Sequence, residues 1–302
     1  MLKLCSLAIL LVLYPVSNVR AQLPGNAGAH YSFEVVDPPG VPADSVYALG
    51  INDLDIIAGY YRTNSNCYAP GDTCDVGYLK DGANYHSILL GTAGYTFLSG
   101  TNDAGISVGT CCGSNSAHGP GVAYSGRDGA FHLIFAPGAQ ATFLTSISNL
   151  GVIGGYSEAP GNLTSGFLLQ DGTFTQIVYP GAAGTYVYGV NSSGQAVGNA
   201  VMGTSAQAFL YQDGAFQLIQ YPGAASTAAN GINDAGIIVG SYTLPGSTIS
   251  YGFIYHGGVF SPFDQPDCKG TIPQGVNNYG AIVGEDCSGA FIATPDSQAA
   301  GH

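Results

Sequence analysis

The chain has 302 residues, of which 46 are Gly, 20 are Tyr and none is Trp, and only 8% of them are charged. Its formal charge is −13 and its pI about 4.4. An acidic surface repels the phosphates of nucleic acids and of anionic membranes, so we expect neither as a partner. The acidity also fits a simpler purpose, which is to keep a glycine-rich protein soluble.

Residues 1–21 have the pattern of a signal peptide. Lys3 gives a positive start, residues 4–16 form an apolar run too short to span a bilayer, and Ala21 ends a typical cleavage site. We therefore expect a secreted or periplasmic protein without membrane insertion. Cleavage also removes Arg20, so that four basic residues remain against nineteen acidic ones, a formal charge of −15. We assign residues 22–296 to a single monomeric domain and residues 297–302 to a disordered tail.

A ten-residue motif recurs through the mature chain. GINDAGIIVG begins at Gly231, and related stretches begin at Gly50, Gly100, Ser146, Gly189 and Gly275. The motif asparagines are Asn52, Asn102, Asn191, Asn233 and Asn277, with Ser148 in the third copy, and the spacings are 50, 46, 43, 42 and 44. A period in the forties indicates a repeat architecture whose units bury their apolar faces against each other. The Asn-Asp turns are therefore interpreted as structural, since a ligand loop would not be copied six times.

The fifth period contains four predicted strands, at residues 227–233, 237–242, 251–255 and 259–264. Tight turns separate them, and the turn between the third and fourth strands recurs as Asp81-Gly82, Asp128-Gly129, Asp171-Gly172 and Asp213-Gly214. These pairs predict type I′ turns, which need positive φ.

Four strands per repeat predict an all-β fold, a six-bladed β-propeller with four antiparallel strands per blade and a kelch-like strand order. The strand before the motif asparagine would be innermost. The ends of the chain offer an unaccompanied strand at residues 31–37 and an incomplete hairpin at residues 288–294. Their pairing would close the ring without leaving an open sheet edge.

The repeat wording GINDAGxIVGxY, followed by GFLY, a DG turn, an aromatic residue and YPGA, resembles the HAF-type extracellular repeats of bacterial secreted proteins. The likeness covers nearly the whole mature chain. It is weakest in the third copy, where Ser148-Asn149 replaces Asn-Asp, and in the long insertion of the first. This resemblance implies export and repetition rather than a defined activity.

Catalysis in a propeller channel usually needs paired carboxylates, or a histidine and an acid. The predicted inner strands carry no charged residue and no histidine, and no nucleophile elbow, zinc-helix or phosphate-loop motif is present. We place any site instead on the face with the variable second-to-third-strand loops. Two candidates there are His118 and Glu158, which could equally be solvated surface residues.

Acidic residues gather on the same predicted face. Asp72 and Asp75 should face Asp264, Asp267, Glu285 and Asp286 across the closing blades. Asp267, Glu285 and Asp286 could hold Ca²⁺, or the whole set could be a solvated rim. The predicted ligand-binding residues are Tyr68, Asp72, Asp75, His118, Glu158, Asp267 and Glu285. Tyr60, Tyr61, Tyr156 and Tyr242 could also stack on sugars, or simply pack.

Six cysteines follow the signal peptide, and an even count in an exported chain indicates disulfides. The hairpin register of the last repeat brings Cys268 close to Cys287, which predicts a bond between them. Cys67 with Cys74 is the natural local pair. Cys111 with Cys112 would need a rare vicinal bond.

The sequence thus predicts a non-catalytic binding or scaffold propeller, with a glycan, a peptide or another cell-envelope component as ligand and no cofactor other than a conceivable Ca²⁺. A hydrolase or lyase using loop-face carboxylates is the alternative. A purely structural protein is the third reading.

Overall fold

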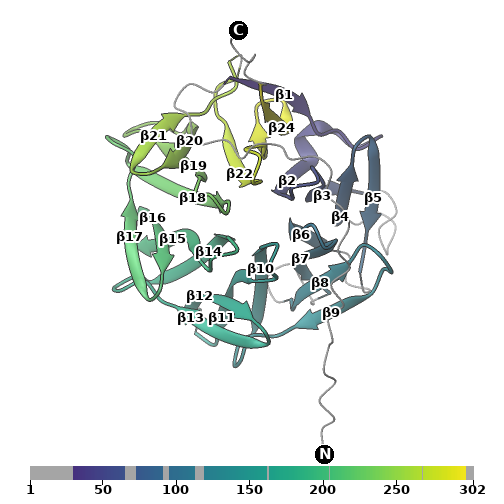
Figure 1. Cartoon of the computed structure of the whole chain (residues 1–302), viewed down its shortest axis with the longest axis horizontal. Coiled ribbons are helices and arrows are strands. Elements are labelled where there is room, and N and C mark those ends of the chain that lie inside the picture. Colours follow the sequence, from purple (N-terminus) through teal and green to yellow (C-terminus); the bar gives the residue numbers. More distant parts are fainter. Residues whose placement is uncertain are drawn as a thin grey trace, which may run out of the picture.

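The computed structural model describes residues 30–64, 73–90, 95–112, 119–161, 163–203, 205–266 and 268–296. In these segments, 24 strands and one short 3-10 helix, η1 (Ala43–Ser45), make a ring of sheets around a central axis (Figure 1). The expected all-β propeller is confirmed. No helix in this part of the chain is long and apolar enough to cross a membrane. The predicted signal peptide and C-terminal tail lie outside the described residues, and the domain bounds stay a prediction.

Each sheet runs outward from an inner strand. Three sheets are formed within single repeats: β2 (Val46–Ile51), β3 (Ile57–Thr63), β4 (Cys74–Asp81) and β5 (Asn84–Ile88); β6 (Thr96–Thr101), β7 (Ile106–Cys111), β8 (Gly121–Ser125) and β9 (Phe131–Ile134); β18 (Ser226–Ile232), β19 (Ile238–Thr243), β20 (Ser250–His256) and β21 (Val259–Pro262). The largest sheet comprises β10 (Ala141–Ile147), β11 (Ile153–Ala159), β12 (Leu163–Gln170), β13 (Thr173–Ile177), β14 (Gly184–Val190), β15 (Ala196–Met202), β16 (Ser205–Gln212) and β17 (Ala215–Ile219).

The prediction of six separate four-stranded blades is wrong. Hydrogen-bond connectivity gives four four-stranded sheets and one eight-stranded sheet, which holds both the third and the fourth repeat. The two repeats are joined by a parallel bridge between Thr164 of β12 and Gly184 of β14.

The remaining four-stranded sheet combines both ends of the described chain. It contains β22 (Ile272–Val276), β23 (Ile282–Asp286) and β24 (Gly289–Pro295), with β1 (Tyr31–Val35) on the outside. The pairing runs from Tyr31 with Pro295 to Val35 with Phe291. Chain ends far apart in sequence thus complete one four-stranded sheet and close the ring (Figure 1).

The apolar core lies between neighbouring sheets. One cluster packs Val46, Ala48 and Ile57 of the first sheet against Val283 and Ala290 of the last. Because strand side chains alternate between faces, second strands send consecutive residues into the two adjacent clusters, as β3 does with Ile57 and Ala58. The ring is therefore held together by sheet-to-sheet packing all round.

The motif asparagines bond the inner ends of the sheets to one another. The asparagine Oδ1 accepts hydrogen bonds from later N–H groups of its own turn, as Asn233 does from Ala235 and Ile237. The side-chain amide then donates to the next repeat's carbonyl, in the pairs Asn52 to Asn102 (3.0 Å), Asn102 to Ser148 (3.3 Å), Asn191 to Asn233 (3.1 Å), Asn233 to Asn277 (3.0 Å) and Asn277 to Asn52 (3.0 Å). The asparagine side chains therefore connect neighbouring repeats by hydrogen bonds.

Hairpin turns follow the predicted geometry in part of the ring. Both central residues have positive φ at Asp171-Gly172, Asp213-Gly214 and Gly257-Gly258, as type I′ requires. At Asp81-Gly82 and Asp128-Gly129 only the glycine does. In the first repeat β4 continues through Asp81, which shifts the turn by one residue, and in the second a longer connection separates β8 from β9.

Candidate functional site

A β-bulge recurs in all six inner strands, just before the motif's first glycine. In the first sheet, Ala48 pairs with Gly59 and Gly50 with Ala58, which leaves Leu49 unpaired. We call the six unpaired residues the bulge ring: Leu49, Ser99, Thr145, Tyr188, Asn230 and Gln274. A bulge re-aims the side chain of the extra residue, and here it turns one side chain per repeat toward the axis.

Glycines on both sides of the bulge specify it. A Cβ on Gly109, which pairs opposite the bulge of the second repeat, would lie 1.8 Å from the Phe97 carbonyl oxygen. A Cβ on Gly50, next to the bulge of the first repeat, would lie 2.8 Å from the Cα of Gly100. Gly109 thus allows the close contact of β6 with β7 at the bulge, and Gly50 allows the inner strands of neighbouring sheets to approach each other.

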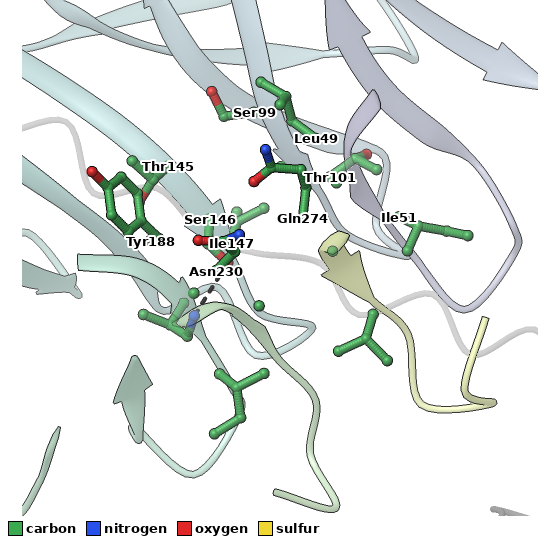
Figure 2. A pocket seen from close by; sticks show the side chains of 18 residues that line it. Leu49, Ile51, Ser99, Thr101, Thr145, Ser146, Ile147, Tyr188, Asn230 and Gln274 are labelled. Carbon is green, nitrogen blue, oxygen red and sulfur yellow. Dashed lines mark hydrogen bonds between the residues drawn. The ribbon is translucent and has the colours of Figure 1, made fainter. Parts of the chain in front are cut away.

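The bulge ring lines a cavity of about 70 Å³ on the axis, together with the motif glycines and the residues that follow them (Figure 2). Figure 2 shows Tyr188 beside Thr145 on one side, and Gln274 near Leu49 and Ser99 on the other. No lining residue is charged. A cavity needs at least about 10–15 Å³ to hold one water, so this one is large enough to hold water.

Hydrogen bonds hold the two amides of the bulge ring in place. The amide nitrogen of Asn230 donates to the carbonyl of Pro273 (2.8 Å), and that of Gln274 donates to Oε2 of Glu285 (3.0 Å). Among the described residues, neither amide oxygen accepts a hydrogen bond. The fixed nitrogens thus leave two oxygens for a ligand at the cavity.

An aromatic cluster positions Tyr188, which precedes Asn230 in the order of the bulge ring. Tyr186 lies parallel to it (6.2 Å between ring centroids, 11° between planes), and Tyr156 meets it edge-on (6.3 Å, 75°). Phe143 stacks on Tyr156 (4.6 Å, 18°). Burial raises the pKa of the Tyr188 hydroxyl to about 12, and the neighbouring Tyr186 adds to this. Tyr188 therefore presents a neutral hydroxyl at any physiological pH.

Glu285 lies behind the side chain of Gln274, between β23 and β2. Its carboxyl accepts hydrogen bonds from Gln274 and from the backbone N–H of Ala48. The other oxygen, Oε1, is buried without a partner among the described residues. Burial raises the pKa of this carboxyl to about 7, which the two hydrogen bonds only partly offset. Glu285 is thus a buried carboxyl that titrates near neutral pH, and it does not itself line the cavity.

The opposite end of the channel is closed by the residues after the motif asparagines: Asp53, Asp103, Asn149, Ser192, Asp234 and Asn278, here called the turn ring. All of these side chains except Ser192 accept from a backbone N–H group of the preceding repeat, as Asp103 does from Asp53 (2.9 Å), and the Ser192 hydroxyl donates to Asp234 (3.1 Å). Asn149 and Asn278 also donate to these carboxylates. Burial, then the charge of Asp53, raises the pKa of Asp103. The bonds of the turn ring therefore serve the scaffold.

Of the predicted ligand-binding residues, four lie outside the described residues: Tyr68, Asp72, His118 and Asp267. Asp75 forms an ion pair with Arg62 (2.9 Å). The charges of Asp75 and Glu285 both act on Tyr60, whose pKa is raised mainly by burial. Glu158, on β11, adds to the raised pKa of Tyr156 in the same way. These acids thus sit beside the tyrosines of the channel mouth.

The tyrosines expected to stack on sugars have ring partners within the chain. Tyr60 stacks on Tyr47 (4.5 Å, 11°), and Tyr242 on Tyr221 (3.6 Å, 6°). Tyr61 is tilted against Tyr78. For these three, packing accounts for the aromatic ring.

The predicted calcium ligands Glu285 and Asp286 are adjacent on β23, so their side chains point to opposite faces. Oδ1 of Asp286 accepts from the backbone N–H of Ser288 (2.7 Å), and its Oδ2 is buried without a partner among the described residues. Asp286 lies within 4.8 Å of the Cys268 and Cys287 sulfurs, but these are joined to each other. Calcium binding stays a prediction.

The disulfide predicted between Cys268 and Cys287 is present, with 5.7 Å between the Cα atoms. The vicinal bond between Cys111 and Cys112 is present as well. Cys74 is disulfide-bonded, and its predicted partner Cys67 lies outside the described residues. The bonds lie on the face where the inner strands begin, here called the loop face, which is also the end at which the aromatic cluster lies.

Sequence reasoning missed the bulge ring, although the motif holds a signal for it. The residue before the motif is Leu, Ser, Thr, Tyr, Asn or Gln in the six copies, whereas the residue preceding it is apolar in all copies and the residue following it is glycine in all but the third. A position that varies between polar and apolar side chains inside such a strand marks a side chain that the scaffold does not constrain.

No protein-family model matches the sequence, and no curated protein sequence matches it either. Among solved structures, TolB from Acinetobacter baumannii is similar with a TM-score of 0.53 at 16% identity, over 86% of this chain and 66% of TolB. The β-propeller domain of the Trilobed protease from Pyrococcus furiosus has a TM-score of 0.50 at 7% identity, over 81% of this chain and 90% of that domain. A gluconolactonase from Xanthomonas campestris has a TM-score of 0.50 at 12% identity, over 84% and 88%. At these identities the likeness extends to the fold, and the chain is a β-propeller.

Proposed function

We propose that this propeller is an exported binding protein without catalytic activity, and that its ligand docks on the loop face at the mouth of the channel. The bulge ring carries the proposal. Six bulges at equivalent positions turn chemically different side chains toward one cavity, while the backbone around them repeats. Convergent polar groups in a concave site are the usual mark of a binding site. A glycan, a peptide or another cell-envelope component fits an exported protein of this kind.

Export is supported by the cysteine chemistry. Disulfides form and persist in oxidising compartments, and this chain holds the bonds Cys111–Cys112 and Cys268–Cys287. The signal-peptide pattern at residues 1–21 points the same way.

The proposal is tested by probing arrays of immobilised glycans and peptides with the mature protein, with and without about 1 mM Ca²⁺, the range in which extracellular calcium sites are filled. Binding to one ligand class is the expected result, and no binding to either array would refute it. In the same samples, a melting temperature that calcium leaves unchanged would rule out the metal site.

One observation favours the alternative of a hydrolase or lyase. Glu285 has a pKa of about 7, which suits a general acid. Against it, both hydrogen-bond donors of Glu285 belong to the wall behind the cavity, and a glycosidase needs a second carboxylate facing the substrate. Turnover of an array ligand that Glu285→Gln abolishes, with binding retained, would establish the alternative.

A further inference from the structure

We propose that the bulge ring binds a neutral sugar residue at the end of a glycan, with the sugar's end inserted into the axial cavity and the rest of the chain lying on the loop face. This inference rests on the proposed binding function and specifies its site and ligand. It moves the site from the acidic rim expected from the sequence to the uncharged centre of the ring.

The charge of the cavity selects a neutral ligand. None of its lining residues is charged, and the carboxyl of Glu285 is turned into the wall by Gln274 and Ala48. A uronate or an ammonium group placed here would lose its hydration without gaining a counter-ion, which is costly. An uncharged polar group has no such penalty.

The polar groups of the cavity match hydroxyls. The amide oxygens of Asn230 and Gln274 are available as acceptors because each amide is anchored through its nitrogen. The hydroxyls of Ser99 and Tyr188 can both donate and accept. Thr145 contributes less, because its hydroxyl already lies 2.9 Å from the carbonyl oxygen of Val187. Acceptors and hydroxyls on several sides suit a group that bears more than one hydroxyl.

The ring of Tyr188 supplies the apolar contact that sugar recognition needs in addition to hydrogen bonds. Tyr188 is half-buried and is held by Tyr156 and Tyr186, so its ring is already ordered before a ligand arrives. A pre-ordered ring gives apolar contact at little cost in side-chain entropy. A sugar combines a C–H face with hydroxyl edges, and the tyrosine ring and the two amides together match both. The cavity holds about 70 Å³, which admits the end of one residue rather than a whole oligosaccharide.

The test is calorimetric titration of the mature protein with cellohexaose, maltohexaose and chitohexaose as neutral probes and hexagalacturonate as the anionic probe. Leu49 shows that the bulge conformation is compatible with leucine, so Gln274→Leu and Asn230→Leu should remove the amides while keeping the backbone conformation. Each should weaken binding of the neutral probe about three- to tenfold, as expected for one lost hydrogen bond. Tyr188→Leu should weaken it at least about fivefold, and Tyr188→Phe less, since it keeps the ring.

Ser192→Ala, in the turn ring at the other end of the channel, is the matched control and should bind as the parent does. The melting temperature of each variant shows that it folds. Binding of the neutral probe that survives Gln274→Leu, Asn230→Leu and Tyr188→Phe unchanged would overturn the inference, as would binding of hexagalacturonate alone, and both outcomes would leave the proposed function intact. If no neutral probe binds at millimolar concentration, the inference fails. If the protein also binds nothing on the peptide and glycan arrays, the proposed function is refuted as well.

Discussion

Replacing the buried carboxyl of Glu285 should change how stability depends on pH. Its pKa is 4.5 when exposed and about 7 in the folded protein, because burial disfavours the charged form. The folded state therefore binds more protons than the unfolded state between these values, and stability must fall as pH rises through them. At 1.36 kcal/mol for each pH unit, the loss is about 3 kcal/mol, complete somewhat above pH 7. Glu285→Gln should abolish this part of the pH dependence.

The measurement is urea unfolding of the parent and of Glu285→Gln, with disulfides intact, at several pH values from 4.5 to 8.5. Burial also raises the pKa of Asp103 and Asp264, so the parent's total fall includes other groups, and the difference between the two proteins isolates Glu285. Asp213→Asn, in an exposed hairpin turn, is the control and should follow the parent. Parallel curves for the parent and Glu285→Gln, or a parent that gains stability relative to Glu285→Gln as pH rises, would refute the buried-carboxyl reasoning.

Three further changes test the scaffold. Gly109→Ala should destabilise the protein by at least about 3 kcal/mol in thermal or urea melts, because the added Cβ meets a backbone oxygen that the bulge fixes. Gly126→Ala, whose added Cβ would have its nearest contact at 3.5 Å, should be tolerated. Equal effects of the two changes would contradict the bulge geometry. Asn277→Ala should cost about 2 kcal/mol by leaving buried N–H and carbonyl groups unpaired, and no loss would show that the amide ladder carries no stability. Cys268→Ser with Cys287→Ser should cost about 3 kcal/mol under non-reducing conditions, and a parent insensitive to reductant would argue against the bond.

The repeat, its strands and its turns could be predicted because each rests on local chemistry. Positive φ at Gly236 and the Asx bonds of Asn233 are written into a few neighbouring residues. The pairing of the chain ends was also predictable, since two incomplete strand sets had only each other as partners. The division into sheets was not predictable. It depends on the single bridge between Thr164 and Gly184, a contact set by how two repeats pack.

The candidate site was harder to predict than the fold. Composition placed the acids on the loop face, but their chemistry depends on partners from other repeats: Asp75 is paired with Arg62, and Glu285 is turned toward β2. The bulge ring could not be predicted from the apolar pattern, because a bulge changes the register by one residue without disturbing that pattern. The channel strands contain no charged residue, and the absence of charge does not distinguish the uncharged variable position from its neighbours.

The variation within the bulge ring bears on whether this propeller is merely structural. A glycine opposite each bulge, and in all repeats but the third a glycine next to it and an asparagine three residues on, fix the backbone independently of the bulge side chain. A purely structural ring would be expected to fill its centre with small apolar side chains of matching size. Instead the six positions range from Ser99 to Tyr188, include two amides held by their own hydrogen-bond partners, and enclose space rather than filling it. Amide oxygens without a hydrogen-bond partner among the described residues stabilise nothing in the unliganded protein, so their arrangement is better explained by a ligand whose hydroxyl groups they meet.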